Sequence, residues 1–457
     1  MRGLRRWLSG RTPAEGLGWL DILRLGLVQA ALGAVVVLTN STLNRVMVVE
    51  LGLAAVIPGL LVGLHYGVQI TRPLWGHRSD AGASRTRFIL AGLALLALSG
   101  TLAAATTFLF ERDLRLGLLV AVVAYTLIGI GIGASGTSLL ALIATRTAPG
   151  RRASAATITW MMMILGIIVT SIVTGAVLDP YSHARLVTIT ALTGVVAFAL
   201  AVLALLGIER RSVSLAAPAP EKAGLAFRDS LREVWQDREA RLFTLFIFLS
   251  MLAYSTQDLI LEPFAGLLFA MTPGETTTLS GTQHAGVFLG MAAVGIGGWQ
   301  AGRRAPALAR FFILAGCLGS AAALGLLVMA AAAAPRWPLE ATVFALGVAN
   351  GLFAVAAIGT MMGLAADGRT PNAGLRMGVW GAAQAIAFGL GGLTGSLVVD
   401  LGRRMTASDR DAFMIVFALE AGLFLASSLV ALGLGRGGPA RAAAQAAPSR
   451  QHPLPAE

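Results

Sequence analysis

Twelve long apolar runs, separated by short charged segments, constrain this 457-residue chain more than any other feature of its sequence. A bilayer core about 30 Å thick is crossed by about 20 residues of apolar helix, and each run is close to that length or longer. The runs predict an all-α polytopic membrane protein with 12 transmembrane helices. They span residues 21–44, 53–71, 87–109, 116–140, 156–178, 186–208, 242–270, 284–301, 309–333, 340–364, 377–399 and 412–434.

Composition agrees with a membrane protein, because 56% of the residues are hydrophobic and only 13% are charged. A soluble domain carries about a quarter charged residues. The formal net charge of +12 comes almost wholly from arginine, since Lys222 is the only lysine. These arginines lie between apolar runs, where they orient the chain and meet anionic lipid, so we expect no nucleic-acid partner. The single cysteine, Cys317, excludes a disulfide framework, and no metal site is predicted.

The distribution of positive charge predicts the topology. With the runs as given, the N-terminus, the even-to-odd loops and the C-terminus hold 26 Arg and Lys residues, whereas the opposite side holds 8. Cytoplasmic loops carry the excess of positive charge, so both termini are predicted to be cytoplasmic. The layout is then a cytoplasmic interfacial segment at 1–20, a six-helix bundle at 21–208, a central cytoplasmic loop with an amphipathic helix at 209–240, a second six-helix bundle at 241–435 and a disordered tail at 436–457.

The two halves of the chain echo each other in sequence. "RTAPGRR" (146–152) follows the fourth run and "RTPNAGLR" (369–376) follows the tenth. "TGAVLD" (174–179) ends the fifth run and "TGSLVVD" (394–400) ends the eleventh. Matching strings at matching positions indicate a duplicated six-helix unit, as in the major facilitator superfamily.

The loop "RPLWGHRSDAGASRTR" (72–87) resembles the loop signature of that superfamily, a glycine and an acid followed by basic residues. A glycine permits a tight turn, and an aspartate can hold an arginine or cap a helix. We interpret the loop as a cytoplasmic latch, and the alternative is a positively charged loop with no further role. The predicted latch residues are Gly76, Arg78, Asp80, Arg85 and Arg87.

The string "GIGIGASG" (129–136) contains the spacing GxGxxG at Gly131, Gly133 and Gly136. A dinucleotide site requires this spacing after a strand within a βαβ unit, and here it lies inside an apolar run. We therefore expect these glycines to let two helices approach closely.

Two acids stand in the seventh run, in the string "QDLILEP" (257–263). Asp258 and Glu262 are one turn apart and face the same side of a helix. Each costs about 2.5–3.5 kcal/mol at the bilayer centre, so their presence requires a reason. One hypothesis is a pair of interfacial acids on a helix that Pro263 breaks, with the apolar "FAGLLFAM" as a tilted continuation. The other is a pair that lines an internal groove and relays protons, binds arginine or contacts a ligand.

Other polar residues in the runs are few. Asn40, Asn44, Arg45 and Glu50 are expected near the outer end of the first span, where Arg45 can pair with Glu50 or with the acids of the seventh run. Glu420 is a candidate proton site in the twelfth run, and an interhelical hydrogen bond is the alternative. His65 and His284 are packing residues or weak ligands of a metal or pigment. No catalytic triad, phosphate loop or metal-ligand spacing supports an enzyme.

Two long stretches resemble the PucC/LhaA family, the bacteriochlorophyll delivery branch of the major facilitator superfamily. They are "TLNRVMVVELGL" (42–53), followed by "LHYG" and "RPLWGHRSD", and "QDLILEPFAG" (257–266), followed by "MTPGETTTLSGTQHAGVFLGM" (271–291). The resemblance extends from about Leu17 to Leu434. The residues that match the family pattern are Asn44, Arg45, Glu50, Gly76, Ser79, Asp80, Gln257, Asp258, Glu262 and Pro263.

The resemblance implies an assembly factor for bacterial light-harvesting antenna complexes in the inner, photosynthetic membrane. Such a protein is expected to handle bacteriochlorophyll as a transient ligand while α and β antenna polypeptides assemble, with His65 or His284 as a weak axial magnesium ligand. Two alternatives stay open: a proton-coupled exporter that uses Asp258, Glu262 and Glu420, and a scaffold that binds antenna helices without pigment.

Overall fold

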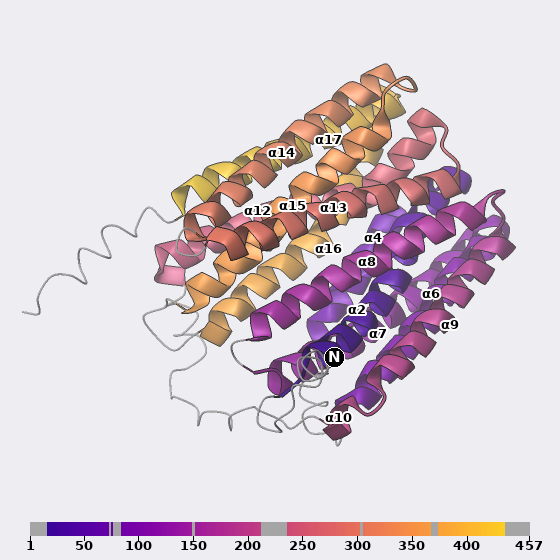
Figure 1. Ribbon diagram of the computed structural model, residues 1–457. Coiled ribbons are helices and arrows are strands. Elements are labelled where there is room, and N and C mark those ends of the chain that lie inside the picture. The colour runs from indigo at the N-terminus through magenta and orange to yellow at the C-terminus, as the bar shows by residue number, and fades with distance from the viewer. Residues whose placement is uncertain are drawn as a thin grey trace, which may run out of the picture.

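The computed structural model describes residues 16–72, 75, 84–148, 151–211, 235–301, 305–366 and 373–434. Across these ranges the chain is helical, and the β-structure there is one isolated bridge between Gly16 and Thr147. The long helices form a sheaf with their axes roughly aligned, as Figure 1 shows. The predicted all-α membrane fold is therefore confirmed.

The helices follow the predicted runs closely. In order they are α2 (Trp19–Val37), η2 (Leu38–Thr42), α3 (Leu43–Arg45), η3 (Val46–Glu50), α4 (Val56–Val68), η4 (Gln69–Thr71), α6 (Arg85–Arg112), α7 (Leu114–Arg146), α8 (Arg152–Leu178), α9 (His183–Leu205), α10 (Ile208–Arg211), α12 (Arg238–Phe269), α13 (Pro273–Ala301), α14 (Ala305–Ala333), α15 (Leu339–Ala366), α16 (Ala373–Thr406) and α17 (Asp409–Gly433).

Ten helical stretches in the described part of the chain are long and apolar enough to cross a membrane. The predicted second and eighth spans are not among the ten. Helix α4 has only 13 residues, and the first half of α13 is the polar stretch "PGETTTLSGTQHAG". The chain is thus a multi-pass membrane protein with ten candidate spans among the described residues. The number of twelve spans stays a prediction.

Two large hydrophobic cores hold the helices together. One is built from the first half of the chain and includes Leu25, Leu93 and Tyr125. The other is built mainly from the second half and includes Phe246 and Phe353. In Figure 1 the indigo-to-magenta helices and the orange-to-yellow helices form two neighbouring groups. The exact boundaries at 21–208 and 241–435 stay predictions, and most of the segments at 1–20, 209–240 and 436–457, with the amphipathic helix, lies outside the described residues.

The glycine-rich string 129–136 lies within α7, as expected. A Cβ atom on Gly131 would be 2.7 Å from the carbonyl oxygen of Gly92 on α6, a distance that real Cβ atoms do not reach. Only glycine lets the two backbones approach this closely. The string therefore serves helix packing.

The predicted end of the seventh run at residue 270 agrees with the structure, whereas the predicted end of the first run was wrong. The seventh helix, α12, continues through Pro263 to Phe269 and ends where Ala270 adopts a left-handed conformation with φ of 54°. The first helix does not stop at residue 44 but continues through η2, α3 and η3 to Glu50. Asn44 and Arg45 consequently lie within the last two turns of a continuous helix, where both are buried.

The two halves meet along three helix pairs. Helix α8 packs on α13, α4 packs on α16, and the segment from η2 to η3 packs on α12. Figure 1 shows α8 and α13 side by side at the boundary between the two groups of helices. These contacts place the polar residues of the first helix against the two acids of α12.

Candidate functional site

The first transmembrane helix is distorted where it meets the second half. Two π-helical segments, η2 and η3, flank the single α-helical turn Leu43–Arg45. A π-helical turn is rare and occurs mostly at functional sites, because it rotates the side chains that follow it. Here the distortion accompanies three polar contacts between the first helix and the second half of the chain.

The first contact explains how α12 passes through a proline. Pro263 has no N–H group, so the carbonyl of Leu259, four residues earlier, lacks its helical donor. The Nδ2 atom of Asn44 donates a hydrogen bond to this carbonyl oxygen at 2.5 Å. In a membrane, a carbonyl freed by proline has to be satisfied by a neighbouring helix. Asn44 thus has a structural role that its sequence position alone did not reveal.

The second contact involves Arg45, which is almost fully buried. Its guanidinium forms an ion pair with Glu50 and donates to the carbonyl oxygen of Met271 at 2.7 Å. The same group lies against Gly266 on α12, where a Cβ atom would be 3.1 Å from Nη2. Glu262 is an electrostatic neighbour of Arg45. The structure thus contains the predicted pair with Glu50, and it places Glu262 near Arg45 without an ion pair between them.

The third contact joins two hydroxyl groups, those of Thr42 and Thr277, at 3.2 Å. Thr277 lies on α13, so the first helix touches both helices that open the second half. Residues of the first helix thus contact both sides of the turn between α12 and α13.

Three carboxyl groups lie in this interior. Glu262 on α12 and Glu420 on α17 are buried, and Asp258 keeps a partly exposed side chain with a buried Oδ1 atom. Among the described residues no hydrogen-bond partner meets Oδ1 of Asp258 or either carboxylate oxygen of Glu420, whereas Glu262 has the hydroxyl of Thr276 and the guanidinium of Arg45 as neighbours. Asp258 and Glu420 interact electrostatically with each other.

Buried polar atoms without partners are costly, so they require water, a proton or a ligand. The side-chain amide of Gln257, next to Asp258, has no partner at either atom in the described residues. We call the following set the central polar row: Asn44, Arg45, Gln257, Asp258, Glu262 and Glu420.

An aromatic row lies beside Asp258 and joins the two halves. Ring centroids are separated by 5.6 Å between Tyr66 on α4 and Phe388 on α16, and by 6.0 Å between Phe388 and Tyr254 on α12. Phe353 on α15 follows at 6.4 Å from Tyr254. Both tyrosines interact electrostatically with Asp258. The interior therefore combines carboxyls with aromatic rings, and the aromatic row was not predicted from the sequence.

The two predicted histidine ligands lie in different surroundings. The Nδ1 atom of His284 is 2.8 Å from the carbonyl oxygen of Ser280, which leaves Nε2 as the acceptor of a neutral imidazole. His284 stands between Gly281, which contacts α8, and Val287, which packs with residues of both halves. His65 stacks on Tyr66 at 4.1 Å, and its Nδ1 atom has no partner in the described residues.

The predicted latch is only partly described. Gly76, Arg78 and Asp80 lie outside the described residues. Arg85 begins α6 and donates to the carbonyl oxygen of Ala141 at 2.7 Å, whereas Arg87 is exposed. In the described residues the start of α6 is capped by Glu209, which accepts from the N–H of Arg85 at 2.8 Å and from the hydroxyl of Ser84 at 2.5 Å. Sequence analysis missed Glu209, because "IERR" reads as an ordinary charged loop.

No group of three or more His, Cys, Asp or Glu residues suited to a metal ion occurs in the parts of the chain that the structure describes. The arrangement offers carboxyl and amide groups that can bind protons, water or polar groups of a ligand at the contact between the halves.

A family comparison now identifies the chain. The sequence profile described as PUCC protein matches residues 42–438, which include the central polar row. The chain belongs to this family. A relative in Rhodobacter capsulatus named "Bacteriochlorophyll synthase 44.5 kDa chain" is 54% identical over 418 residues, covering 92% of this chain and 96% of the relative. "Protein PucC" of Cereibacter sphaeroides is 30% identical over 434 residues, covering 91% and 92%.

Solved structures resemble the fold of this family member. A bacterial homologue of the human lysosomal transporter Spinster, in an inward-facing and unoccupied conformation, gives a TM-score of 0.64 at 14% identity, covering 90% of this chain and 94% of that chain. The nucleoside transporter NupG gives a TM-score of 0.64 at 13% identity, covering 91% and 100%. At this identity the likeness shows the fold alone, and the helices of this chain are arranged as in these transporters.

Proposed function

We propose that this chain is an assembly factor for bacterial light-harvesting antenna complexes that handles bacteriochlorophyll while antenna polypeptides assemble. Membership in the PUCC family and the relative named after bacteriochlorophyll synthase direct the proposal to this pigment. The structural observation that carries it is the aromatic row beside the central polar row, at the contact between the halves.

The residues present suit a large, flat and mostly apolar molecule. Tyr66, Tyr254 and Phe388 offer ring faces, and each is only partly buried. Aromatic rings stack in offset or edge-to-face arrangements at the separations found here. Unpartnered acids nearby can accept hydrogen bonds from polar groups of a ligand or from water.

Bacteriochlorophyll supplies a magnesium ion that accepts one axial ligand. His284 is the stronger candidate for this ligand, because its Nδ1 bond to Ser280 fixes the tautomer with a free Nε2 lone pair. His65, with an unpartnered Nδ1 atom, is the second candidate. A single neutral imidazole binds weakly, which suits release to an antenna polypeptide.

We propose that the chain resides in the bacterial inner or photosynthetic membrane with twelve spans and both termini in the cytoplasm, since arginine is concentrated on that side. Its proposed partners are the α and β light-harvesting polypeptides. We propose a non-catalytic role, which membership in the PUCC family and the transporter-like fold support.

The test is deletion of the gene in a native phototroph, followed by an absorption spectrum of the membranes. Loss of the antenna bands is expected, with recovery when the unchanged chain is returned. Recovery should be weak for Tyr66→Ala combined with Tyr254→Ala, and full for Phe311→Ala, an exposed aromatic residue on α14. Antenna bands of normal height in the deletion strain would exclude the proposal.

A second function is favoured by one observation, the presence of two buried carboxyls and one partly exposed carboxyl inside a transporter-like fold. It is proton-coupled export of a small molecule through the interior. Proton uptake by vesicles that contain the protein would then follow an inward proton gradient and disappear in Asp258→Asn. A pigment-binding protein without such uptake supports the first proposal instead.

A further inference from the structure

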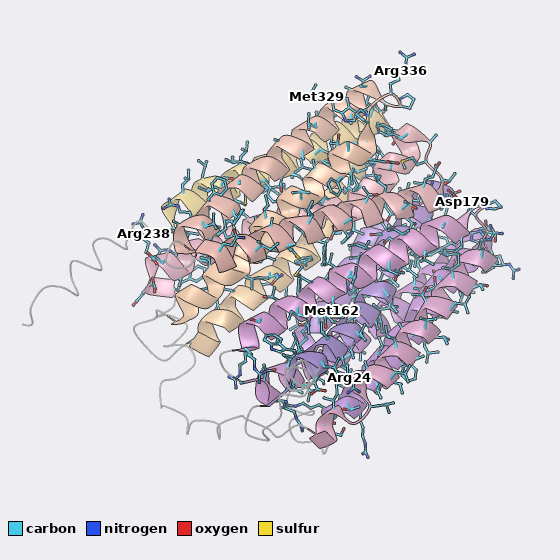
Figure 2. The ribbon with its side chains drawn as sticks, viewed as in Figure 1. Arg24, Met162, Asp179, Arg238, Met329 and Arg336 are labelled. Atoms are coloured by element: carbon cyan, nitrogen blue, oxygen red, sulfur yellow. The ribbon has the colours of Figure 1, made fainter. Side chains whose placement is uncertain are left out.

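The duplicated strings "TGAVLD" and "TGSLVVD" end on the same face of the molecule and have no part in the central polar row. The first ends with Asp179 at the end of α8, and the second ends with Asp400 near the end of α16. Figure 2 shows Asp179 at the end of the helices opposite to Arg24 and Arg238. We call this end the Asp179 face.

Asp179 caps a helix of the other half. Its Oδ1 atom accepts from the N–H of Gly274 at 3.2 Å, and its Oδ2 atom accepts from the hydroxyl of Thr272 at 2.5 Å. The segment Thr272–Glu275 already forms a capping box, in which Thr272 and Glu275 exchange hydrogen bonds at 2.8 and 3.2 Å. Asp179 therefore adds a carboxylate from the first half to the start of α13.

Asp400, on α16 of the second half, caps a helix of the first half. Its two carboxylate oxygens accept from the N–H groups of Ala55 and Val56 at 3.0 and 2.8 Å, at the start of α4. The residue at the start of this helix, Ala55, offers no side-chain cap. A helix N-terminus carries partial positive charge and free N–H groups, so a carboxylate from the second half stabilises it.

Small residues bring the same helix pairs into direct contact below each aspartate. A Cβ atom on Gly274 would be 2.5 Å from the carbonyl oxygen of Gly175, so α8 and α13 touch backbone to backbone. A Cβ atom on Gly59 of α4 would be 2.9 Å from the Cβ atom of Ser396 on α16. Each carboxylate thus closes a seam that is already tightly packed.

We propose that Asp179 and Asp400 form a two-sided clasp that keeps the Asp179 face of this protein shut. Each aspartate reaches from one half to a helix start in the other half, and the two act in opposite directions. The halves separate at this face only when both sets of hydrogen bonds break. While the clasp holds, a ligand reaches the central polar row by way of the opposite end or the lipid side.

The test measures access to cysteines placed in the two seams. Ser171→Cys lies in the α8–α13 seam, where it faces Gly281, and Ser396→Cys lies in the α4–α16 seam, where it faces Gly59; both positions are buried. Each reporter is built in a Cys317→Ser background, reconstituted in lipid nanodiscs and treated with a water-soluble maleimide. Loss of a helix cap corresponds to a change of about two- to thirtyfold in an equilibrium constant, so each Asp→Ala change should raise the labelling rate by about that factor. The double variant should exceed either single variant.

The aspartate-to-asparagine changes are the matched controls, because asparagine keeps one acceptor oxygen. Their labelling rates should fall between those of the aspartate and alanine forms. Native Cys317, buried within the core of the second half, reports unfolding in chains without the introduced cysteines. Unchanged labelling of both reporters in the double alanine variant, with Cys317 still protected, overturns the clasp.

If Cys317 becomes labelled in the alanine variants, those variants are unfolding, and the asparagine variants are used in their place. Equal labelling rates of the reporter cysteines in the aspartate and asparagine forms then overturn the clasp. The assay requires neither pigment nor antenna polypeptides. Its outcome is therefore independent of the proposed function.

Discussion

The hydrogen bond from Asn44 to the carbonyl of Leu259 predicts an energetic coupling with Pro263. Asn44→Ala leaves this buried carbonyl without a donor, since Pro263 offers no N–H group. An unsatisfied buried acceptor costs about 1–3 kcal/mol, and we expect Asn44→Ala to lower the free energy of unfolding by about that amount. In a Pro263→Ala background, the N–H of the new alanine can bond to Leu259. The same Asn44→Ala change should then cost less than about 1 kcal/mol.

The measurement is a double-mutant cycle on the purified protein in detergent, with unfolding followed by tryptophan fluorescence. Asn40→Ala is the matched control, because Asn40 lies on the same helix one turn earlier and its Oδ1 atom has no partner in the described residues. Its cost should be the same with proline or alanine at position 263. An equal cost of Asn44→Ala in both backgrounds would refute the reasoning, since the carbonyl would then not depend on Asn44.

Three other contacts predict measurable effects. Gly131→Ala should destabilise the protein by about 1–3 kcal/mol because its Cβ atom meets the Gly92 carbonyl, whereas Gly136→Ala in the same string has open space; thermal unfolding compares the two. Arg45→Leu leaves Glu262 buried without its cation and should cost about 3–5 kcal/mol, and adding Glu262→Leu should recover a large part of the loss. Burial raises the pKa of Glu209, but hydrogen bonds from Ser84, Arg85 and Thr86 outweigh it and hold the pKa below its ordinary value of 4.5. A carboxyl whose pKa is lower in the folded than in the unfolded chain stabilises the fold at a pH above its unfolded pKa, and this stabilisation is lost as the pH falls through its folded pKa. The difference in free energy of unfolding between the native chain and Glu209→Gln should therefore shrink from about pH 6 to about pH 3. A difference that stays constant over that range would contradict the capping role.

The fold could be predicted largely from the sequence because a bilayer imposes helix length. Every predicted apolar run except the second and eighth coincides with a helix that can cross a membrane. The ends were less predictable, since they depend on contacts between distant helices. Pro263 is a local signal for a helix to end, yet α12 continues through it. The carbonyl that Pro263 frees is satisfied by Asn44, 215 residues away in the sequence.

The candidate site was predictable in its residue types and less so in its geometry. Unusual charges in apolar runs pointed to Arg45, Asp258, Glu262 and Glu420, and the structure gathers these residues in one interior. The aromatic row was missed, because tyrosine and phenylalanine are ordinary residues in a membrane helix. The capping role of Asp179 and Asp400 was also missed. The repeated strings indicate a duplication but do not predict which helix each aspartate contacts.

The interior acids divide into two groups, and the division bears on function. Glu262 lies near the guanidinium of Arg45, which is always charged, so the chain itself supplies a cation there. Asp258 interacts electrostatically with Glu420 and with two tyrosines, and none of these neighbours is a cation. Two carboxyls in this position require protons, water or the donor groups of a ligand. The chain thus completes the surroundings of Glu262 by itself but leaves those of Asp258 open, beside the aromatic row where we propose that the pigment binds.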